Sequence, residues 1–288
     1  MANSIALAKN YTQMLDEVYK LASLTSILDS DASLARAGAN ANEILIPKLD
    51  MSGLADYSRN SGYVGGDVNL TWETVKFNYD RGRLFQVDTM DNEESIDIAF
   101  GRLAGEFIRT KVAPEGDAFT ISTIAAKSGA TVKKDGALAD GDAVLNALLA
   151  GMTKMDEDEV PADQRILFIT PTLKRAVEQL ENYKSKAVFD AITVVATPQS
   201  RMYTAIDLQD GKTLGEEAGH YKKASDASEI NFLLVHKPAV LKFNKHTASD
   251  IITPAANQTA DAYMQKYRKY GLVDVYENKV AGVYVSTK

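Results

Sequence analysis

The sequence predicts an α+β protein, and three observations support this fold class. Residues 68–88 alternate between apolar and polar side chains, which is the two-residue period of β-strands. Residues 93–112 then place apolar side chains at helical spacing, at Ile96, Phe100, Leu103 and Phe107. From about residue 137 onward, helical and strand-like segments alternate before the chain ends in strands. We therefore expect a long hairpin, a long helix and a separate α/β portion.

Composition excludes several classes of protein. The 288 residues are 45% hydrophobic, which is ample for a packed core, and they include no cysteine, which fits a reducing cytoplasm. The net charge of −7 disfavours the non-specific electrostatic binding on which basic nucleic-acid proteins rely. The longest aliphatic or aromatic runs, ILFI from Ile166 and FLLV from Phe232, are strand-length and too short to span a membrane. We expect no membrane association.

The N-terminal part predicts an arm that precedes the first strand. Residues 5–28 have a roughly helical spacing of apolar side chains, and the small and polar residues up to 42 predict an extended segment. Removal of residues 1–28 is expected to affect assembly more than folding. The next segment, EILIPKLDM, predicts an edge strand because Pro47 cannot donate a ladder hydrogen bond. The glycine-rich residues 53–67 predict a loop.

The alternating segment carries a change of face. Val68, Leu70 and Trp72 share one face, whereas Val75 and Phe77 have the opposite parity. The strand therefore changes its buried face near residues 73–74 or contains a bulge there. We expect Trp72 to be buried at the root of this ribbon.

The residues Asp80, Arg81, Gly82 and Arg83 are predicted to form the turn of the hairpin. Gly82 tolerates the positive φ that hairpin turns require, and Phe85 and Val87 resume the alternation. This prediction gives a hairpin with a charged tip. The helix that follows should begin near Asp91–Glu94, where acidic residues favour a helix N-terminus, and Pro114 should interrupt or kink it.

No catalytic, cofactor-binding or metal-binding pattern is recognisable. The three histidines lack metal-ligand spacing, and no G-x-G-x-x-G, Walker A or G-x-S-x-G sequence occurs. The acidic groups Asp88–Glu94 and Asp156–Glu159 are explained by a helix N-terminus and a solvated helix end. We therefore expect no enzyme activity, no cofactor and no metal.

Three stretches of the sequence resemble one protein family. The stretches are WETVKFNYDRGRLFQVDTMDNEES, EFIRTKVAPEGDAF, and the ending INFLLVHKPAVLKFNKH with ADAYMQKYRKYGLVDVYENKVAGVYV. Together they resemble the major capsid proteins of tailed bacteriophages, and the similarity extends over nearly the whole chain. The resemblance implies the Hong Kong 97-type (Johnson) capsid fold, with an N-terminal arm, an extended β-hairpin loop, a peripheral domain with a long spine helix and an axial α/β domain.

The resemblance also implies how the chain is divided and what it does. The expected division is 1–42 for the arm, 43–92 for the extended loop, 93–120 with 241–288 for the peripheral domain, and 121–240 for the axial domain. The implied function is self-assembly into hexamers and pentamers of an icosahedral shell around double-stranded DNA, in the virion and assembled in the host cytoplasm. Contact residues are expected at the ribbon, namely Trp72, Asp80, Arg81, Gly82 and Arg83.

The implied partners are other copies of the chain, a portal protein, a decoration protein, and packaged DNA that is bound without sequence specificity. Only about 42 residues precede the first strand, so we expect any scaffolding protein to be a separate chain. Two alternatives stay open. One is an encapsulin-type nanocompartment that binds a cargo protein's terminal peptide, and the other is a small-molecule α/β enzyme built on residues 137–240.

Overall fold

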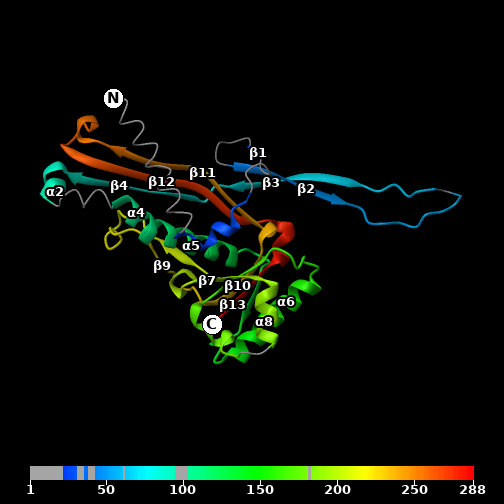
Figure 1. Cartoon of the computed structure of the whole chain (residues 1–288). Coiled ribbons are helices and arrows are strands. Elements are labelled where there is room, and N and C mark those ends of the chain that lie inside the picture. Colours follow the sequence, from blue (N-terminus) through cyan, green and yellow to red (C-terminus); the bar gives the residue numbers. More distant parts are fainter. Residues whose placement is uncertain (1–21, 31–35, 38–42, 61, 95–102, 181–182) are drawn as a thin grey trace.

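The computed structural model describes residues 22–30, 36–37, 43–60, 62–94, 103–180 and 183–288. They form a body of sheets and helices from which a long two-stranded ribbon projects (Figure 1). The predicted helix at the N-terminus lies mostly outside the described residues. Its last part, Leu24–Leu28, is a 3₁₀-helix.

A five-stranded sheet forms the centre of the body. Its order is β5 (Thr131–Lys134), β13 (Val283–Thr287), β10 (Ile230–His236), β6 (Arg165–Ile169) and β7 (Thr193–Ala196). The strand β10 is antiparallel to both of its neighbours, and the two outer pairs are parallel. Every residue of β6, β10 and β13 is buried, which explains the uninterrupted apolar runs in the sequence.

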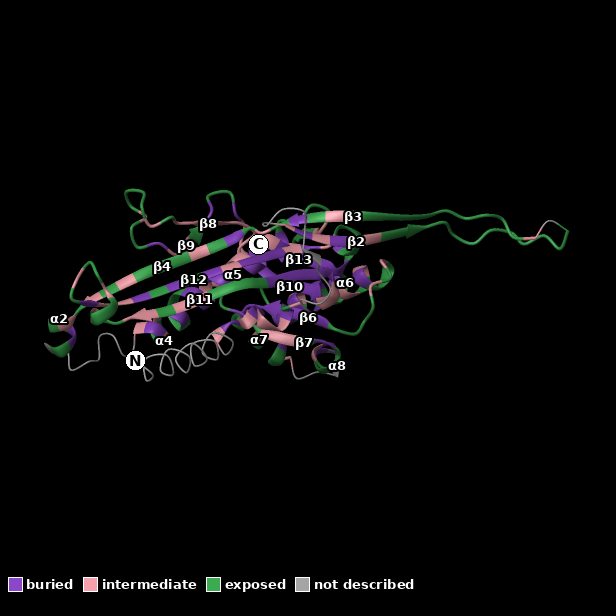
Figure 2. Cartoon of the chain, turned by 90° about the horizontal axis from the view of Figure 1, so that it is seen from above, coloured by how far each residue is buried: buried purple, intermediate pink, exposed green. Residues whose placement is uncertain are grey.

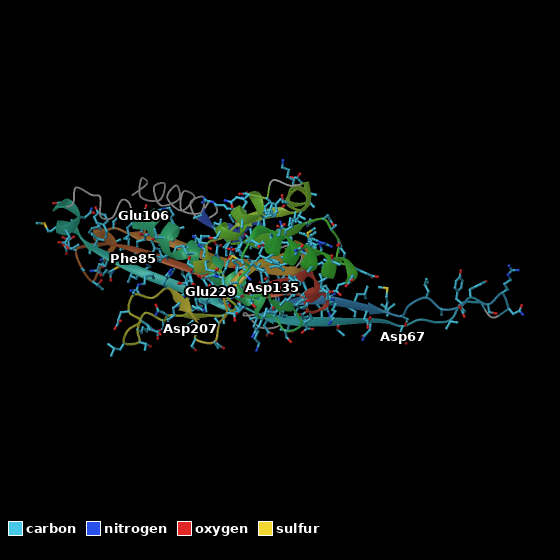
Figure 3. All side chains as sticks on the ribbon, turned by 90° about the horizontal axis from the view of Figure 1, so that it is seen from below. Asp67, Phe85, Glu106, Asp135, Asp207 and Glu229 are labelled. Atoms are coloured by element: carbon cyan, nitrogen blue, oxygen red, sulfur yellow. The ribbon has the colours of Figure 1, made fainter. Side chains whose placement is uncertain are left out.

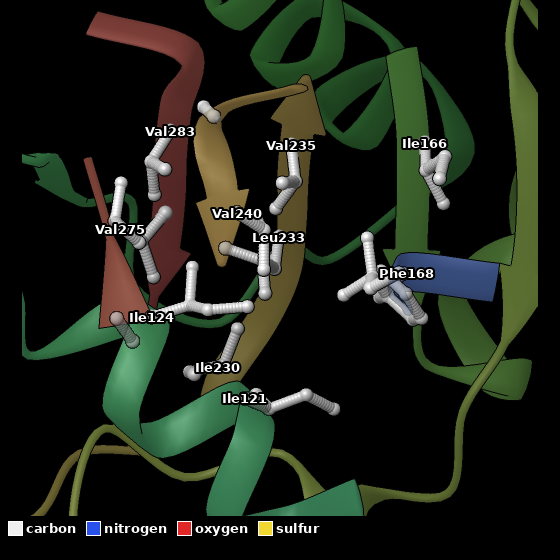
Figure 4. Close-up of a cluster of buried hydrophobic side chains, with 14 of the residues drawn as sticks. Ile121, Ile124, Ile166, Phe168, Ile230, Leu233, Val235, Val240, Val275 and Val283 are labelled. Carbon is white, nitrogen blue, oxygen red and sulfur yellow. The ribbon is translucent and has the colours of Figure 1, made fainter. Parts of the chain in front are cut away.

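The two faces of this sheet bury alternate side chains. Ile166 and Phe168 of β6 pack with Ile121 and Ile124 of α5 (Ala113–Ala125), as Figure 4 shows. The opposite face packs against three helices, α6 (Gly141–Glu157), α7 (Pro171–Glu178) and α8 (Tyr183–Ala191). The alternation follows from the two-residue period of a strand.

A second, three-stranded sheet runs along the other side of α5. Its order is β11 (Val240–Ile252), β12 (Ala262–Val275) and β4 (Tyr79–Asp88), and all its pairs are antiparallel. The helix α2 (Thr89–Glu94) follows β4. A two-stranded sheet, β8 (Ile206–Leu208) with β9 (Tyr221–Lys223), lies beside this part of the body.

The long helix continues through Pro114 and is not interrupted by it. The helix α4 (Leu103–Phe107) leads into a π-helical turn, Ile108–Val112, and then into α5. The backbone stays in the right-handed helical region at Phe107, Val112 and Ala113. Proline lacks an N–H and crowds the preceding turn, and the wider π turn directly before it accommodates this change. The prediction that Pro114 interrupts the helix is therefore wrong, because the helical backbone runs through this residue. Residues 95–102 of the predicted helix lie outside the described residues.

The ribbon consists of β2 (Glu43–Met51) and β3 (Val68–Lys76), which pair without a register shift. The short strand β1 (Arg36–Ala37) pairs with the base of β2. The predicted pairing of residues 68–76 with 84–88 across a turn at Asp80–Arg83 is wrong. Instead β3 pairs with β2, and β4 pairs with β12 along its whole length.

Candidate assembly surface

The root of the ribbon is buried in the body. Ile44, Ile46 and Val75 pack against Leu241, Phe243 and Leu272, which belong to β11 and β12. Ile44 and Ile46 are two residues apart in β2, and Ile44 pairs with Val75 of β3. Because side chains alternate along a strand, all three lie on the same face of the β2–β3 pair. The root is thus the only part of the described ribbon that is fixed by core packing.

Farther out, the apolar side chains lie on the opposite face. The register pairs Pro47 with Trp72, Leu49 with Leu70, and Met51 with Val68, so these six side chains form one continuous cross-strand ladder. The face behind them is polar, because Lys48 pairs with Thr71 and Asp50 pairs with Asn69. The predicted change of face at residues 73–74 is therefore confirmed. It occurs without a bulge, because the register is continuous.

This outer apolar face is exposed in the single chain (Figure 2). Nine of the fourteen large apolar side chains that are exposed among the described residues lie between Leu49 and Trp72. Trp72 is 45% exposed, so the expectation that it is buried is wrong. Trp72 is an odd number of residues away from Val75 in β3. Its side chain therefore lies on the outer apolar face and not on the face that packs at the root. An exposed, contiguous apolar strip on a two-stranded ribbon is typical of an interaction surface.

The tip of the ribbon is the glycine-rich segment that the sequence predicts to be a loop. The hydroxyl and backbone of Ser52 form hydrogen bonds with the backbone of Asp67, which closes the ends of the segment. Nearer the tip, the rings of Tyr57 and Tyr63 are 4.8 Å apart, and Gly62 adopts a φ of +77°. The tip is polar and glycine-rich apart from these aromatic rings, Leu54 and Val64.

The residues predicted to form a charged tip lie in β4, the outer strand of the three-stranded sheet of the body. Gly82 is required there by close packing, because a Cβ atom at this position would lie 2.7 Å from the carbonyl oxygen of Tyr267. Asp80 accepts two hydrogen bonds from the guanidinium group of Arg268, at 2.9 and 2.7 Å, on the exposed face of the sheet. Arg81 and Arg83 point to the other side, toward the loop between β8 and β9. None of these four residues is at the tip of the ribbon.

Arg81 binds a buried carboxylate on the long helix. Its Nε donates to Glu115 Oε1 at 2.7 Å, and the hydroxyl of Tyr79 donates to the same oxygen at 3.2 Å. Burial raises the pKa of Glu115, but the nearby imidazole of His220 and the hydrogen bonds from Arg81 and Tyr79 outweigh it and lower this pKa below its ordinary value. Glu115 is thus ionised at neutral pH and joins α5 to β4.

Asp117, two residues further along α5, holds the N-terminal segment. It is fully buried and accepts hydrogen bonds from the hydroxyls of Ser23 and Thr25 at 2.7 Å and from Arg201 Nη1 at 2.7 Å. Because Leu28 is fully buried as well, removal of residues 1–28 would take part of the core, so we now expect this deletion to affect folding as well as assembly. The sequence analysis missed both carboxylates. Both carboxylates could have been predicted from one signal, an acidic residue within a helix that is otherwise apolar. A buried charge of this kind needs an oppositely charged or hydrogen-bonding partner.

The described residues offer no alternative metal site, because no group of three or more His, Asp or Glu side chains converges among them. His220, His236 and His246 lie in separate places along the fold. In the same described parts of the chain, no helix is long and apolar enough to cross a membrane.

Comparison with known proteins gives matches at the level of structure only. No protein-family model matches the sequence, and no curated protein matches it. The capsid of Myoviridae phage XM1 is similar with a TM-score of 0.58 at 10% identity, over 92% of this chain and 90% of that chain. The capsid of cyanophage P-SCSP1u is similar with a TM-score of 0.57 at 13% identity, over 88% and 85% of the two chains.

A virus-like particle from Pyrococcus furiosus is similar to the same degree, with a TM-score of 0.57 at 12% identity, over 94% of this chain and 95% of that chain. Identities this low establish the fold and nothing finer. These matches cover 88–94% of this chain and 85–95% of the other chains. The chain therefore has the Hong Kong 97-type capsid fold.

Proposed function

We propose that this chain is the major capsid protein of a tailed bacteriophage, which assembles into the pentamers and hexamers of an icosahedral shell around double-stranded DNA. The observation that carries the proposal is the exposed apolar face of the ribbon, formed by Leu49, Met51, Val68, Leu70 and Trp72. None of the described residues of the same subunit covers this face. A shell provides such a cover, because each ribbon lies across the neighbouring subunit and buries this face on assembly.

The net charge of the chain supports a role as a shell protein and not as a protein that recognises DNA. A net charge of −7 keeps the wall from holding packaged DNA tightly, since favourable binding to phosphates requires basic side chains. The proposed contacts with DNA are accordingly few and independent of sequence. The proposed location is the virion, after assembly in the host cytoplasm.

The division into domains is also part of the proposal. Residues 121–240 would form the axial domain around the fivefold and quasi-sixfold axes, and residues 93–120 with 241–288 the peripheral domain. The pairing of β4 with β12 supports placing β4 in the peripheral domain, so that the extended loop ends at Lys76 and not at residue 92. A separate scaffolding protein, a portal protein and a decoration protein are the proposed partners besides other copies of the chain.

A second candidate is the shell of an encapsulin-type nanocompartment. The similarity to the virus-like particle from Pyrococcus furiosus favours it, because that match covers 94% of this chain. The two proposals share the shell and differ in its contents. Shells purified from the native source contain double-stranded DNA in the first case and a cargo protein in the second.

The test is expression of the chain alone and together with a scaffolding protein, followed by sedimentation and negative-stain microscopy. Closed shells or capsomer rings are expected, with a steep dependence on protein concentration because many weak contacts form together. Monomers alone at high concentration, with and without scaffold, would contradict both shell proposals.

A further inference from the structure

The ribbon is attached to the body over a short length at its root. Just beyond the apolar root, Lys48 Nζ of β2 forms an ion pair with Glu277 Oε2 at 3.4 Å. Glu277 begins the 3₁₀-helix Glu277–Gly282, which leads into β13. Figure 3 shows Asp67, at the outer end of β3, well clear of the body. A small rotation at the root therefore moves the outer part of the ribbon by a much larger amount.

Three carboxylates meet at this junction. Glu73 of β3 pairs with Ile46 of β2, so it lies on the face of the ribbon that packs against the body. Asp274, at the end of β12, and Glu277 belong to the body, and both act electrostatically on Glu73. One carboxylate of the ribbon thus faces two carboxylates of the body.

The two carboxylates of the body each have a lysine partner, whereas Glu73 has none. Lys127 Nζ lies 2.8 Å from Asp274 Oδ1, and Lys48 is bound to Glu277. Glu73 is half-buried, and no hydrogen bond or ion pair joins its carboxylate to any other described residue. With three carboxylates and two lysines, the junction keeps one negative charge that nothing neutralises.

This arrangement makes Glu73 hold a proton more readily than an ordinary glutamate. The titratable groups that act on it from the ribbon and the body are Lys48, Lys127, Asp274, Tyr276 and Glu277. Burial raises the pKa of Glu73, repulsion from Glu277 and Asp274 raises it further, and the two lysines do not outweigh these effects. The stabilisation by protonated Glu73 is complete below the ordinary glutamate pKa of about 4.3 and is lost as pH rises through the raised value.

We infer that Glu73 makes the junction between ribbon and body a pH-sensitive hinge. With Glu73 ionised, repulsion from the body carboxylates lets the ribbon rotate about its root. Uptake of a proton removes the unpaired charge, leaves the Lys48–Glu277 pair in place and holds the ribbon in one position. The direction in which the outer apolar face points is therefore regulated by pH. The inference concerns the single subunit and does not rest on the proposed function.

Distance measurement between two spin labels tests the hinge, because the chain has no cysteine of its own. Labels are attached at Asn69→Cys, on the polar face of the ribbon, and at Asn146→Cys, an exposed position of α6. The full chain is used at a concentration at which sedimentation shows only monomers. Electron double resonance is expected to lose the broad component of the distance distribution as pH falls from about 8 to about 4.5, just above the ordinary glutamate pKa.

Two variants separate the position of the charge from the number of charges. Glu73→Gln keeps the shape of the side chain without its charge and is expected to give the narrow distribution at every pH. The matched control is Asp50→Asn, an exposed carboxylate on the same face of the ribbon but farther from the root, which should respond to pH as the wild type does. A wild-type distribution that does not change with pH, a Glu73→Gln chain that still responds, or an Asp50→Asn chain that no longer responds would overturn the inference.

Discussion

At the scale of single residues, the structure gives Arg81 a structural role in the subunit. Its side chain is only 25% exposed and connects Glu115 to the loop Gln209–His220. Arg83, two residues away, is exposed and makes one hydrogen bond to a carbonyl oxygen. The two arginines were expected to be equivalent tip residues, so their substitutions now have different expected effects.

Arg81→Ala is expected to destabilise the subunit by about 3 kcal/mol, the lower end of the range for removing one partner of a buried ion pair. Glu115 would remain buried without its cation. The matched control, Arg83→Ala, should change the free energy of unfolding by no more than about 0.5 kcal/mol. Urea denaturation of the unassembled subunit measures both values, and equal effects would contradict the assignment.

Glu115 also makes stability depend on pH. Its pKa is lowered in the folded state, so the unfolded state binds more protons between this value and the ordinary glutamate pKa of about 4.3. The stabilisation is therefore complete above the ordinary pKa and is lost as pH falls through the lowered one. Glu115→Gln should flatten the dependence of unfolding free energy on pH over that acidic window, and Glu178→Gln, an exposed carboxylate, controls for the loss of one charge. An unchanged slope in Glu115→Gln would contradict this role.

At the scale of elements, the ribbon is amphipathic with its apolar face turned outward. Leu70 and Thr71 are neighbours in β3, so their side chains lie on opposite faces of the ribbon. Leu70→Asp is expected to abolish shell formation, because it buries a charge in the proposed contact. Thr71→Asp, the same new side chain on the polar face, is expected to assemble normally. For both variants, the free energy of unfolding should stay within about 0.5 kcal/mol of the wild-type value, because both sites are exposed.

Particle yield and melting temperature of the two ribbon variants decide this prediction. Equal yields would show that the apolar face makes no contact. A large loss of melting temperature in Leu70→Asp alone would show that the ribbon stabilises the subunit itself.

The side of a strand on which each side chain lies could be predicted from the sequence, whereas the strand with which it pairs could not. The change of face at residues 73–74 depends only on which side chains are apolar, and this is visible locally. The partner of β4 is β12, which begins at Ala262, and no local pattern specifies a pairing over that separation. Gly82 suggested a turn because glycine serves both turns and close backbone contacts, and only the structure shows that Tyr267 is the reason.

Charged side chains in the core were the other part that the sequence did not reveal. Glu115 and Asp117 lie in a stretch whose apolar residues predict a helix, but the partners that make their burial acceptable come from distant segments such as Ser23 and Arg201. Of the predicted contact residues, Trp72 lies on the ribbon, whereas Asp80–Arg83 lie in β4, away from it. An assembly contact at Trp72 stays a prediction. The apolar face of the ribbon became apparent only when β2 and β3 were paired.

At the scale of the whole molecule, the proposed shell requires a surface that becomes buried on assembly. The body has its own core on both faces of the central sheet, so we expect the subunit to fold before it associates. None of the described ribbon residues belongs to that core; the root, at Ile44, Ile46 and Val75, packs in a separate cluster against β11 and β12. In the proposed shell, contacts would therefore form between surfaces that already exist in the subunit, which keeps the entropic cost of ordering low.

The most direct test is a cryo-electron-microscopy reconstruction of particles assembled from this chain. The account predicts closed shells with fivefold and quasi-sixfold capsomers, in which Leu49, Met51, Val68, Leu70 and Trp72 of each ribbon are buried against a neighbouring copy. Shells in which this face remains in solvent, or a chain that stays monomeric under all assembly conditions, would contradict it.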